Sequence, residues 1–312
     1  MHELAGNGVE PGDALVVATS GTTRTPRGVV LTHAAVRASA VATSARLGVT
    51  ATDTWLACLP LSHIGGLAVI ARAIVTATPL VVHDGFDAAA VTEAARDGAT
   101  LVSLVTTALR RIDPTLFRRV VVGGSRSPAE LPDNVTTTYG MTETGSGVVY
   151  DGVPLAGVEV RVDTEGEIHL RCPMLARCYR DGPIPVVDGW YATGDLGEIE
   201  SDGRLVVHGR RDELIITGGE NVFPTAVEVA VAGHPGVSEV AVAGVPDLEW
   251  GERVVAWIVP TDPSAPPTLA AIRALTAESL PKFMAPKEIR IVESLPTTTS
   301  GKVRRHQLPT YD

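Results

Sequence analysis

The chain has 312 residues, 45% of them hydrophobic, with 31 glycines and 22 prolines, so it is long enough for two domains and too apolar to be disordered. Its formal charge of −10 argues against a nucleic-acid partner, and three cysteines without metal-ligand spacing favour a reducing cytoplasm. No basic segment followed by an apolar stretch opens the chain, so we expect no signal peptide. The apolar stretch Ile64–Val82 contains Arg72 and Pro79, which favours a buried core over a membrane span.

The first half of the chain alternates apolar runs with helical patterns. The apolar runs that we predict as strands are Leu15–Ala18, Asp53–Pro60, Thr78–His83, Thr100–Val105 and Arg119–Val122. The predicted helices are Ala34–Leu47, the run after His63, and Asp87–Arg96. This order predicts a mostly parallel sheet covered on both faces, with ligands at loops beyond the carboxyl ends of its strands. We expect three loops in such positions, Thr19–Arg27, Gly123–Pro128 and Tyr139–Thr144.

The second half changes character twice. From Gly157, apolar and polar residues alternate between Gly and Asp-Gly turns, which predicts antiparallel hairpins. After Gly219 come a helix that begins near Pro224, two strands, the helix Thr268–Ser279 and a basic tail. We therefore predict an α/β protein with a boundary near Asp212. Residues 1–211 form a large domain of mostly parallel sheets and helices plus a β-rich subdomain, and residues 212–312 form a small α+β lid domain.

Six consecutive residues from Thr19 to Arg24 are all Ser, Thr, Gly or Arg. Glycine and small hydroxyl residues let backbone N–H groups turn inward, and hydroxyls and arginines add donors and charge, which suits the oxygens of a polyphosphate. The stretch does not have the Walker spacing of P-loop NTPases. Taken alone, it is equally compatible with an ordinary surface turn.

Seven segments along the chain together resemble the adenylate-forming superfamily of acyl-CoA synthetases, peptide-synthetase adenylation domains and luciferase. In order they are ATSGTTRTPRGV, LPLSHIGGL, VVGGSRSP, YGMTET, WYATGDLG, GRRDELIITGGENVFPTAVE and PTTTSGK. The resemblance implies an enzyme that joins a carboxylate to AMP with release of pyrophosphate and then passes the acyl group to a thiol. It implies ATP, Mg²⁺ and CoA as cofactor and co-substrates, and a small-molecule acid as the partner.

The resemblance also implies a nucleotide site. Glu143 would ligate Mg²⁺, because a carboxylate is the hard ligand that this ion prefers, and Thr142 would bind the α-phosphate. Asp195 would bind both ribose hydroxyls, although ATGD alone is only a hairpin turn. The nucleotide-binding residues expected are Thr19, Ser20, Gly21, Thr22, Thr23, Arg27, Gly123, Gly124, Ser125, Tyr139, Gly140, Met141, Asp195 and Arg210. The alternative for the Glu143 segment is a helix cap with a surface glutamate.

Lys302 is implied as the cation that stabilises charge on the transferred oxygens, so Lys302, Thr142 and Glu143 form the expected catalytic set. Without its context, Lys302 would be read as a solvated lysine of the tail. Asp212 would be the hinge of a domain rotation that brings Gly218 and Gly219 to the thiol, although the two glycines could equally form a hairpin turn and Asp212 a surface charge pair.

The acyl group is expected near His63, Gly65 and Ser125, where His63 without its motif would be read as a core histidine. LPLSHIGGLAVIARAIV followed by VVHDGFDAAA most resembles the o-succinylbenzoate–CoA ligases of menaquinone biosynthesis. That acid carries two carboxylates, and Arg72, Ser125 and Arg126 are candidates to bind the second. The alternatives are a fatty- or aryl-acyl ligase that serves CoA or a carrier protein, and a catalytically decayed nucleotide-binding homologue.

Two features depart from the superfamily pattern. Its phosphate loop usually reads TSGTTGxPKG, whereas this chain has Arg24 for a glycine and Arg27 for the lysine. Arginine retains the charge but is a planar fork, so the exchange is not conservative at a phosphate site. The chain also begins just ahead of this loop, which predicts that most of the usual N-terminal subdomain is absent and that a homodimer covers exposed apolar surface.

Overall fold

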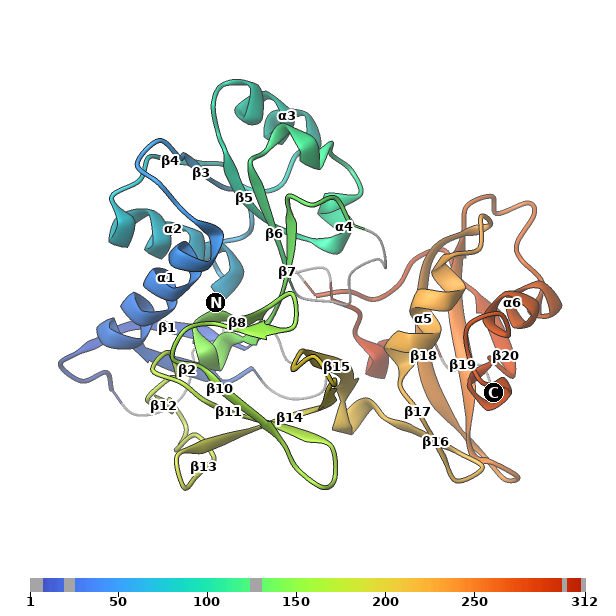
Figure 1. Cartoon of the computed structure of the whole chain (residues 1–312). Helices are drawn as coiled ribbons and strands as arrows, with labels where there is room; N and C mark the ends of the chain where they lie inside the picture. The colour runs from blue at the N-terminus through green and yellow to red at the C-terminus, as the bar shows by residue number, and fades with distance from the viewer. Residues whose placement is uncertain (1–7, 20–25, 124–130, 299–301, 310–312) are drawn as a thin grey trace. The chain divides into compact units, whose positions relative to one another are not determined.

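The fold is given by a computed structural model, which describes residues 8–19, 26–123, 131–298 and 302–309. Contacts divide the chain into two compact units: unit 1 comprises residues 1–193 and 199–206, and unit 2 comprises residues 194–198 and 207–312. Each unit contains at least one sheet (Figure 1), and each has a core of buried hydrophobic residues. The predicted α/β class is confirmed, whereas the predicted boundary at Asp212 stays a prediction.

The largest sheet of unit 1 has seven strands in the order β4-β3-β5-β6-β7-β8-β9. Strands β4 to β7 pair in parallel, and β7, β8 and β9 pair antiparallel. Their bounds are β3 Trp55–Ala57, β4 Leu80–Val82, β5 Leu101–Val105, β6 Arg119–Gly123, β7 Val135–Met141, β8 Ser146–Tyr150 and β9 Val153–Pro154. The predicted strand Asp53–Pro60 is shorter in the structure, because the Asp53 side chain accepts the Thr50 amide in a turn and Pro60 has no N–H to donate.

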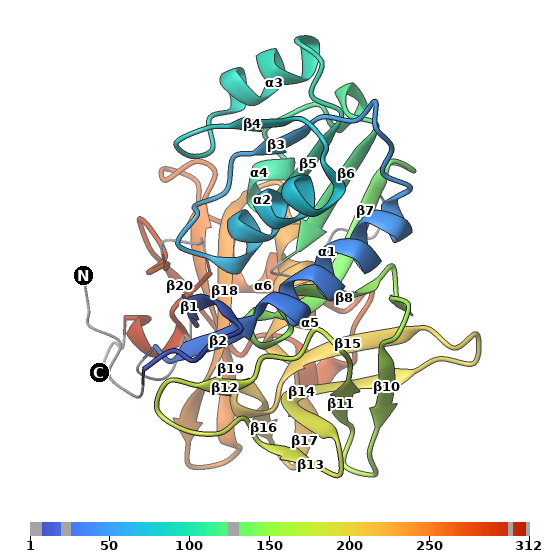
Figure 2. The same ribbon diagram turned by 90° about the vertical axis from the view of Figure 1, so that its left-hand side faces the viewer.

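Helices cover both faces of this sheet, as the parallel pattern requires. The helices α1 (His33–Leu47) and α2 (Ile64–Thr76) lie side by side on one face, and α3 (Ala88–Arg96) and α4 (Thr106–Leu109) lie on the other (Figures 1 and 2). Helix α1 begins where the Thr32 hydroxyl accepts the Ala35 amide, and it ends at Gly48, whose φ is 59°. The alternation along β5 places Val102 and Leu104 in the α3–α4 core and leaves Ser103 for the α2 face.

Unit 1 contains two further sheets. One is antiparallel, with the order β1-β2-β12, formed by β1 (Asp13–Ala18), β2 (Gly28–Thr32) and β12 (Cys178–Tyr179). The other has the order β10-β11-β14-β13, with β15 paired to β14. Its bounds are β10 Glu159–Val162, β11 Glu167–Arg171, β13 Val186–Val187, β14 Trp190–Ile199 and β15 Leu205–Arg210, and the last two strands continue into unit 2.

The loop Thr19–Arg27 does not follow a strand of the parallel sheet, so this part of our prediction is wrong. It joins β1 to β2 as the loop of an antiparallel hairpin, and its ends are held by Thr19 N to Arg27 O at 2.9 Å and Arg27 N to Thr19 Oγ1 at 3.0 Å. Strand β2 was not among the predicted strands. It is a short apolar run next to a helix cap, and such a run does not show from the sequence which strand it pairs with. Residues 20–25 of the loop lie outside the described residues.

Unit 2 is an α+β layer. Its sheet has the order β17-β16-β19-β18, with β20 parallel to β19, and α5 and α6 pack on it. The bounds are β16 Ile215–Thr217, β17 Glu220–Val222, α5 Pro224–Ala232, β18 Val237–Asp247, β19 Gly251–Pro260, α6 Leu269–Thr276 and β20 Glu288–Ile291. The short 3₁₀ helices of the chain are η1 Pro114–Leu116, η2 Thr142–Thr144, η3 Arg211–Glu213, η4 Lys282–Met284 and η5 Arg305–Gln307. Among the described residues, no helix is long and apolar enough to span a membrane.

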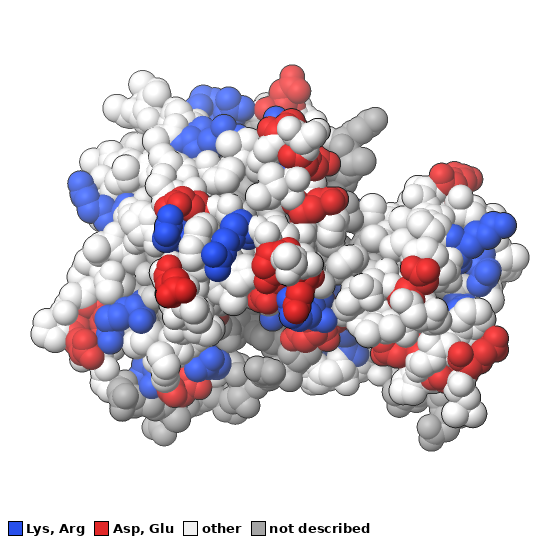
Figure 3. All heavy atoms as spheres, turned by 60° about the horizontal axis from the view of Figure 1, so that its bottom comes forward, with Lys and Arg blue, Asp and Glu red and all other residues white. Residues whose placement is uncertain are grey.

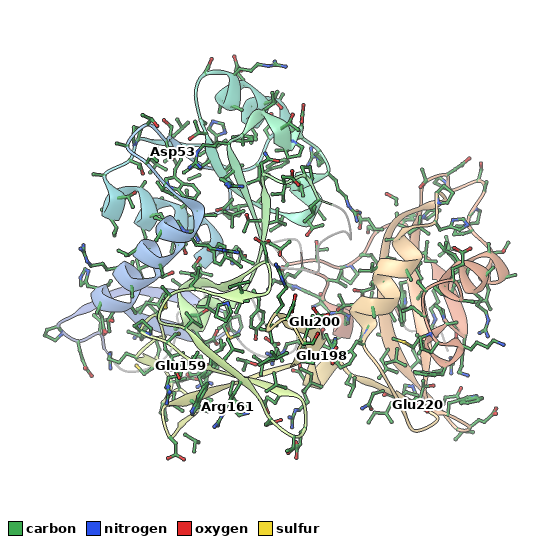
Figure 4. All side chains as sticks on the ribbon, viewed as in Figure 1. Asp53, Glu159, Arg161, Glu198, Glu200 and Glu220 are labelled. Carbon is green, nitrogen blue, oxygen red and sulfur yellow. The ribbon has the colours of Figure 1, made fainter. Side chains whose placement is uncertain are left out.

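The buried carboxylate of Asp53, beside β3, accepts hydrogen bonds from three separate segments of unit 1. Asp53, labelled in Figure 4, is 2% exposed and accepts hydrogen bonds from Arg118 Nε at 2.7 Å, Thr100 Oγ1 at 2.8 Å and the Thr50 amide at 2.8 Å. Burial acts to raise the pKa of Asp53, but these donors outweigh it and hold the pKa at about 2. The charged form is therefore favoured in the folded state.

We expect this carboxylate to make the fold sensitive to acid. Because the folded pKa lies below the ordinary value, the stabilisation is present above about pH 4 and is lost as the pH falls towards 2, and it amounts to about 2 kcal/mol. The measurement is the free energy of unfolding of the unaltered chain and of Asp53→Asn between pH 5 and pH 2. The difference in the free energy of unfolding between the two proteins should become smaller as the pH falls. A difference that stays constant from pH 5 to pH 2 would contradict the proposed role of Asp53.

Candidate functional site

The turn after β7 presents the Glu143 carboxylate. Glu143 lies in η2 between β7 and β8, is 9% exposed, and its Oε1 accepts the hydroxyl of Tyr179 at 2.8 Å. The Thr144 hydroxyl binds the Met141 amide at 3.0 Å and donates to Ser146 O at 2.7 Å, and Ala176 N donates to Glu143 O at 2.7 Å. Glu143 is therefore held at its backbone and its side chain.

Gly140 allows the strands of this turn to approach each other. A Cβ on Gly140 would lie 2.3 Å from Ser146 O and 2.6 Å from Gly147 Cα, distances that no side chain tolerates. The neighbouring Tyr139 is half-buried, and β6 pairs in parallel with β7, so Gly123 at the end of β6 lies beside Thr138. Two of the predicted loops thus begin at the same carboxyl edge of the sheet, although residues 124–130, including Gly124, Ser125 and Arg126, lie outside the described residues.

Arg27, at the end of the loop, contacts an acidic side chain and an aromatic side chain. Its Nε lies 3.0 Å from both carboxylate oxygens of Asp181, and its Nη2 lies 2.9 Å from Oδ1. Its guanidinium carbon lies 3.6 Å from the centre of the Tyr179 ring. The pairing of β12 with β2 brings these residues together, and the sequence analysis missed Tyr179 and Asp181 because they lie some 150 positions from Arg27 along the chain.

A buried arginine lies behind the predicted acyl region. Arg72 of α2 is 3% exposed, and its guanidinium donates to the hydroxyls of Ser103 at 3.1 Å and of Ser146. Its Nε is buried without an acceptor, and no carboxylate pairs with it among the described residues. His63 caps the start of α2 through its carbonyl, which accepts the amides of Gly66 and Leu67, and is half-buried. Gly65 is exposed, and Ser125 lies outside the described residues.

Unit 2 brings three predicted residues together. Arg210 donates from Nη1 to Asp195 Oδ1 at 3.2 Å and from Nε to Asp212 Oδ1 at 3.1 Å. Burial acts to lower the pKa of Arg210, but the charges of Asp195 and Asp212 outweigh it, so the guanidinium keeps its proton. Asp195 is 9% exposed, and its carboxylate is the kind of double acceptor that two ribose hydroxyls require.

Lys302 is exposed at the base of a small hairpin. Its carbonyl accepts the Thr298 amide at 2.8 Å, its amide donates to Thr298 Oγ1 at 3.1 Å, and Thr297 bridges to Val303. Three residues later, Arg305 binds two glutamates in unit 2: Glu213 Oε2 at 2.8 Å and Glu228 Oε1 at 2.9 Å. This triad joins the η3 turn, α5 and the segment that bears Lys302.

Gly218 and Gly219 form the two-residue turn between β16 and β17, with φ of 60° and 84°. The hairpin-turn alternative therefore describes their local structure, and thiol access remains a separate prediction. A Cβ on Gly218 would lie 2.9 Å from the Trp250 ring, so a side chain there would crowd this ring. The Lys287 ammonium lies 3.3 Å from the centre of the same ring.

Comparison with known proteins matches both units. The AMP-binding enzyme family matches residues 5–180, and the AMP-binding enzyme C-terminal domain matches residues 226–302. The chain belongs to the AMP-binding enzyme family. The resemblance drawn from the seven segments is thereby confirmed, and this AMP-binding enzyme has the two-part organisation of its relatives.

Individual relatives of this AMP-binding enzyme are similar over almost its whole length. A probable 2-succinylbenzoate–CoA ligase of Mycobacterium tuberculosis is 42% identical over 97% of the chain and 85% of the relative. The structure of o-succinylbenzoate CoA synthetase from Bacillus subtilis with its acyl-adenylate intermediate has a TM-score of 0.88 at 31% identity, over 95% of this chain and 69% of that one. The same Bacillus subtilis enzyme with ATP and magnesium ion has a TM-score of 0.86 at 30% identity, over 94% and 69%.

Proposed function

We propose that this AMP-binding enzyme is an acid–thiol ligase that activates o-succinylbenzoate as its acyl-adenylate, releases pyrophosphate and transfers the acyl group to CoA, in menaquinone biosynthesis. The observation that carries the proposal is the likeness of 95% of the chain to an enzyme that holds the acyl-adenylate of this acid. The relatives named for the same acid agree with it. ATP, Mg²⁺ and CoA are its cofactor and co-substrates.

The residues of unit 1 fit a hard metal ion. Glu143 offers a buried carboxylate and Thr142 a hydroxyl, and oxygen atoms of this kind are the ligands that Mg²⁺ prefers. When bound, the ion neutralises charge on the phosphate oxygens. In the proposed reaction Thr142 binds the α-phosphate, Tyr139 lies against the adenine, and Asp195 with Arg210 binds the ribose. The remaining predicted phosphate contacts, Ser20 to Thr23, lie in the undescribed part of the loop.

The first half-reaction needs a cation next to the attacking carboxylate and the α-phosphate. Lys302 supplies it in our proposal, because Lys302 is exposed at a hairpin held by two hydrogen bonds to Thr298 and the bridge between Thr297 and Val303. In the second half-reaction we propose that a rotation at Asp212 withdraws Lys302 and brings the Gly218–Gly219 turn to the site. Small residues in that turn leave width for a pantetheine arm.

Arg72 supports a dicarboxylic acid as the substrate. The buried guanidinium has two neutral hydroxyls and the Trp55 ring as partners among the described residues, and no carboxylate balances its charge, which is unfavourable in a protein interior. A carboxylate that accepts from the unoccupied Nε would compensate it. We therefore propose that Arg72, with Ser103 and Ser146, faces the carboxylate of the substrate that is not activated.

We expect Arg72→Met to lower kcat/KM for o-succinylbenzoate by about 100-fold, because one partner of a desolvated charge pair is lost. The analogue that lacks the non-activated carboxylate should react with the Arg72→Met variant and the unaltered enzyme at similar rates. Steady-state kinetics with both acids measures the difference. An equal loss with both acids would show that Arg72 serves only the fold.

The reaction class is tested by ATP–pyrophosphate exchange over a panel of o-succinylbenzoate, benzoates and medium-chain fatty acids. Exchange with o-succinylbenzoate followed by CoA-ester formation supports the proposal. Exchange only with other acids favours a fatty- or aryl-acyl ligase, and exchange without a CoA ester indicates a carrier or amine acceptor. ATP binding without exchange on any acid indicates a decayed homologue.

We also propose a cytoplasmic location and a homodimer. The edge strand β4 of unit 1 exposes Val81 and Val82, and the exposed Leu61 lines the same hollow as Val82, so an apolar edge is available for a second copy. On the face shown in Figure 3, acidic and basic side chains are interspersed. Sedimentation equilibrium measures the mass, and a monomer at all concentrations would overturn the dimer.

A further inference from the structure

Arg27 stands where the superfamily's usual phosphate-loop pattern has lysine, and its surroundings differ from those of a phosphate ligand. A ligand for a triphosphate keeps its donors directed at the anion. Arg27 instead uses Nε and Nη2 on both oxygens of Asp181, at 2.9 to 3.0 Å. Such a bidentate fork fixes the plane of the guanidinium, which a lysine ammonium cannot do.

The fixed guanidinium in turn lies on a tyrosine. Its carbon is 3.6 Å from the centre of the Tyr179 ring, and the Tyr179 side chain is 7% exposed. Stacking of a guanidinium on an aromatic face restricts the ring. The register of β12 on β2, with Tyr179 opposite Val29, places the ring beside Arg27 through backbone pairing.

The hydroxyl of Tyr179 contacts Glu143, the predicted metal ligand. It donates to Glu143 Oε1 at 2.8 Å. A tyrosine hydroxyl keeps its proton at neutral pH, so the phenol remains a hydrogen-bond donor to this carboxylate. One carboxylate oxygen is thereby oriented by a group that is itself held by Arg27 and Asp181.

We propose that Asp181, Arg27 and Tyr179 form a bracket that orients the carboxylate of Glu143 for the metal, and that Arg27 is a positioning residue of this chain in place of a direct phosphate ligand. The inference rests on the proposed function, in which Glu143 binds Mg²⁺. It explains why arginine stands where the superfamily pattern has lysine: only the planar fork can bind Asp181 and cover Tyr179 together. Partners that orient a metal ligand typically change metal affinity by about 10- to 100-fold.

Binding of the β,γ-methylene analogue of ATP, measured by calorimetry with and without Mg²⁺, separates the two roles. The quantity of interest is the metal increment, the ratio of the two dissociation constants. For the unaltered chain we expect a large increment. For Arg27→Lys, Tyr179→Phe and Asp181→Asn we expect the increment to fall by about 10-fold or more, while affinity without metal stays within about 3-fold.

The same sheet offers a matched control. Arg177 makes an equivalent fork with Asp13, with Nε to Oδ1 at 2.9 Å and Nη2 to Oδ2 at 2.7 Å, and neither residue contacts Tyr179 or Glu143 through its side chain. Arg177→Lys should leave the metal increment unchanged. Because Asp181 is half-exposed, Asp181→Asn keeps the test valid if the buried Tyr179→Phe variant does not fold.

Each outcome discriminates. If the variants have the same metal increment as the unaltered chain, the proposal of the bracket is wrong and the proposed function is unaffected. An equal loss of affinity with and without Mg²⁺ in Arg27→Lys shows that Arg27 binds phosphate directly and also overturns the bracket. If the unaltered chain does not bind the nucleotide at all, the proposed function falls and the bracket falls with it.

Discussion

Replacement of Lys302 by alanine should reduce ATP–pyrophosphate exchange with o-succinylbenzoate by about 1000-fold, because in our proposal the ammonium stabilises charge on the transferred oxygens in the transition state. Transfer of the acyl group from preformed acyl-adenylate to CoA should stay close to the unaltered rate, since in our proposal Lys302 is withdrawn from the site before this step. The two half-reactions are measured separately, by isotope exchange and by thioester formation.

The control for this experiment is Lys282→Ala, which removes an exposed lysine of η4 in the same unit. Both half-reactions should be unchanged in this variant. An equal loss of both half-reactions in Lys302→Ala would mean that the lysine supports the unit as a whole, and the assignment of Lys302 to the adenylation step would be abandoned.

The largest effect on stability is expected at Arg305. This side chain is mostly buried and donates to Glu213, to both oxygens of Glu228 and to Val242 O at 3.1 Å. Arg305→Met leaves two mostly buried carboxylates without the cation that they share. Breaking a buried ion pair in this way lowers the free energy of unfolding by about 3 to 5 kcal/mol.

Native-state hydrogen exchange of the β19 amides reports the opening of unit 2 and measures this loss. Arg304→Gln is the control, because its side chain makes no ion pair with the described residues. A triple variant in which Arg305, Glu213 and Glu228 are all apolar should recover most of the stability, since no buried charge is left unpaired. Unchanged exchange in Arg305→Met would contradict the role of the triad.

The sequence predicts the layers of this fold well because buried parallel strands and covering helices have different periods. Helix α1 begins one residue before the prediction, and strand β5 begins one residue later than predicted. The predicted helix Thr268–Ser279 is α6, Leu269–Thr276, since the Thr268 side chain caps it by accepting the Ala271 amide. Such differences are local and follow from caps that short-range patterns locate only approximately.

The candidate site was less accessible to sequence analysis. Residues adjacent in a motif, such as Thr142 and Glu143, are found by reading along the chain. Asp195 and Arg210 are separated by 15 positions, and the structure joins them directly. Tyr179 and Asp181 lie beside the predicted site residues Arg27 and Glu143 because β12 pairs with β2, and the pairing of a two-residue strand leaves no period to detect.

The triad around Arg305 has a mechanical consequence. It connects the η3 turn, which contains Asp212, to the segment that begins three residues after Lys302, so within unit 2 the proposed hinge and the proposed catalytic lysine are linked through one group of ion pairs. In the proposed rotation at Asp212, these ion pairs would make the segment that bears Lys302 move together with the turn. The angle of rotation would then determine how far the Lys302 ammonium moves.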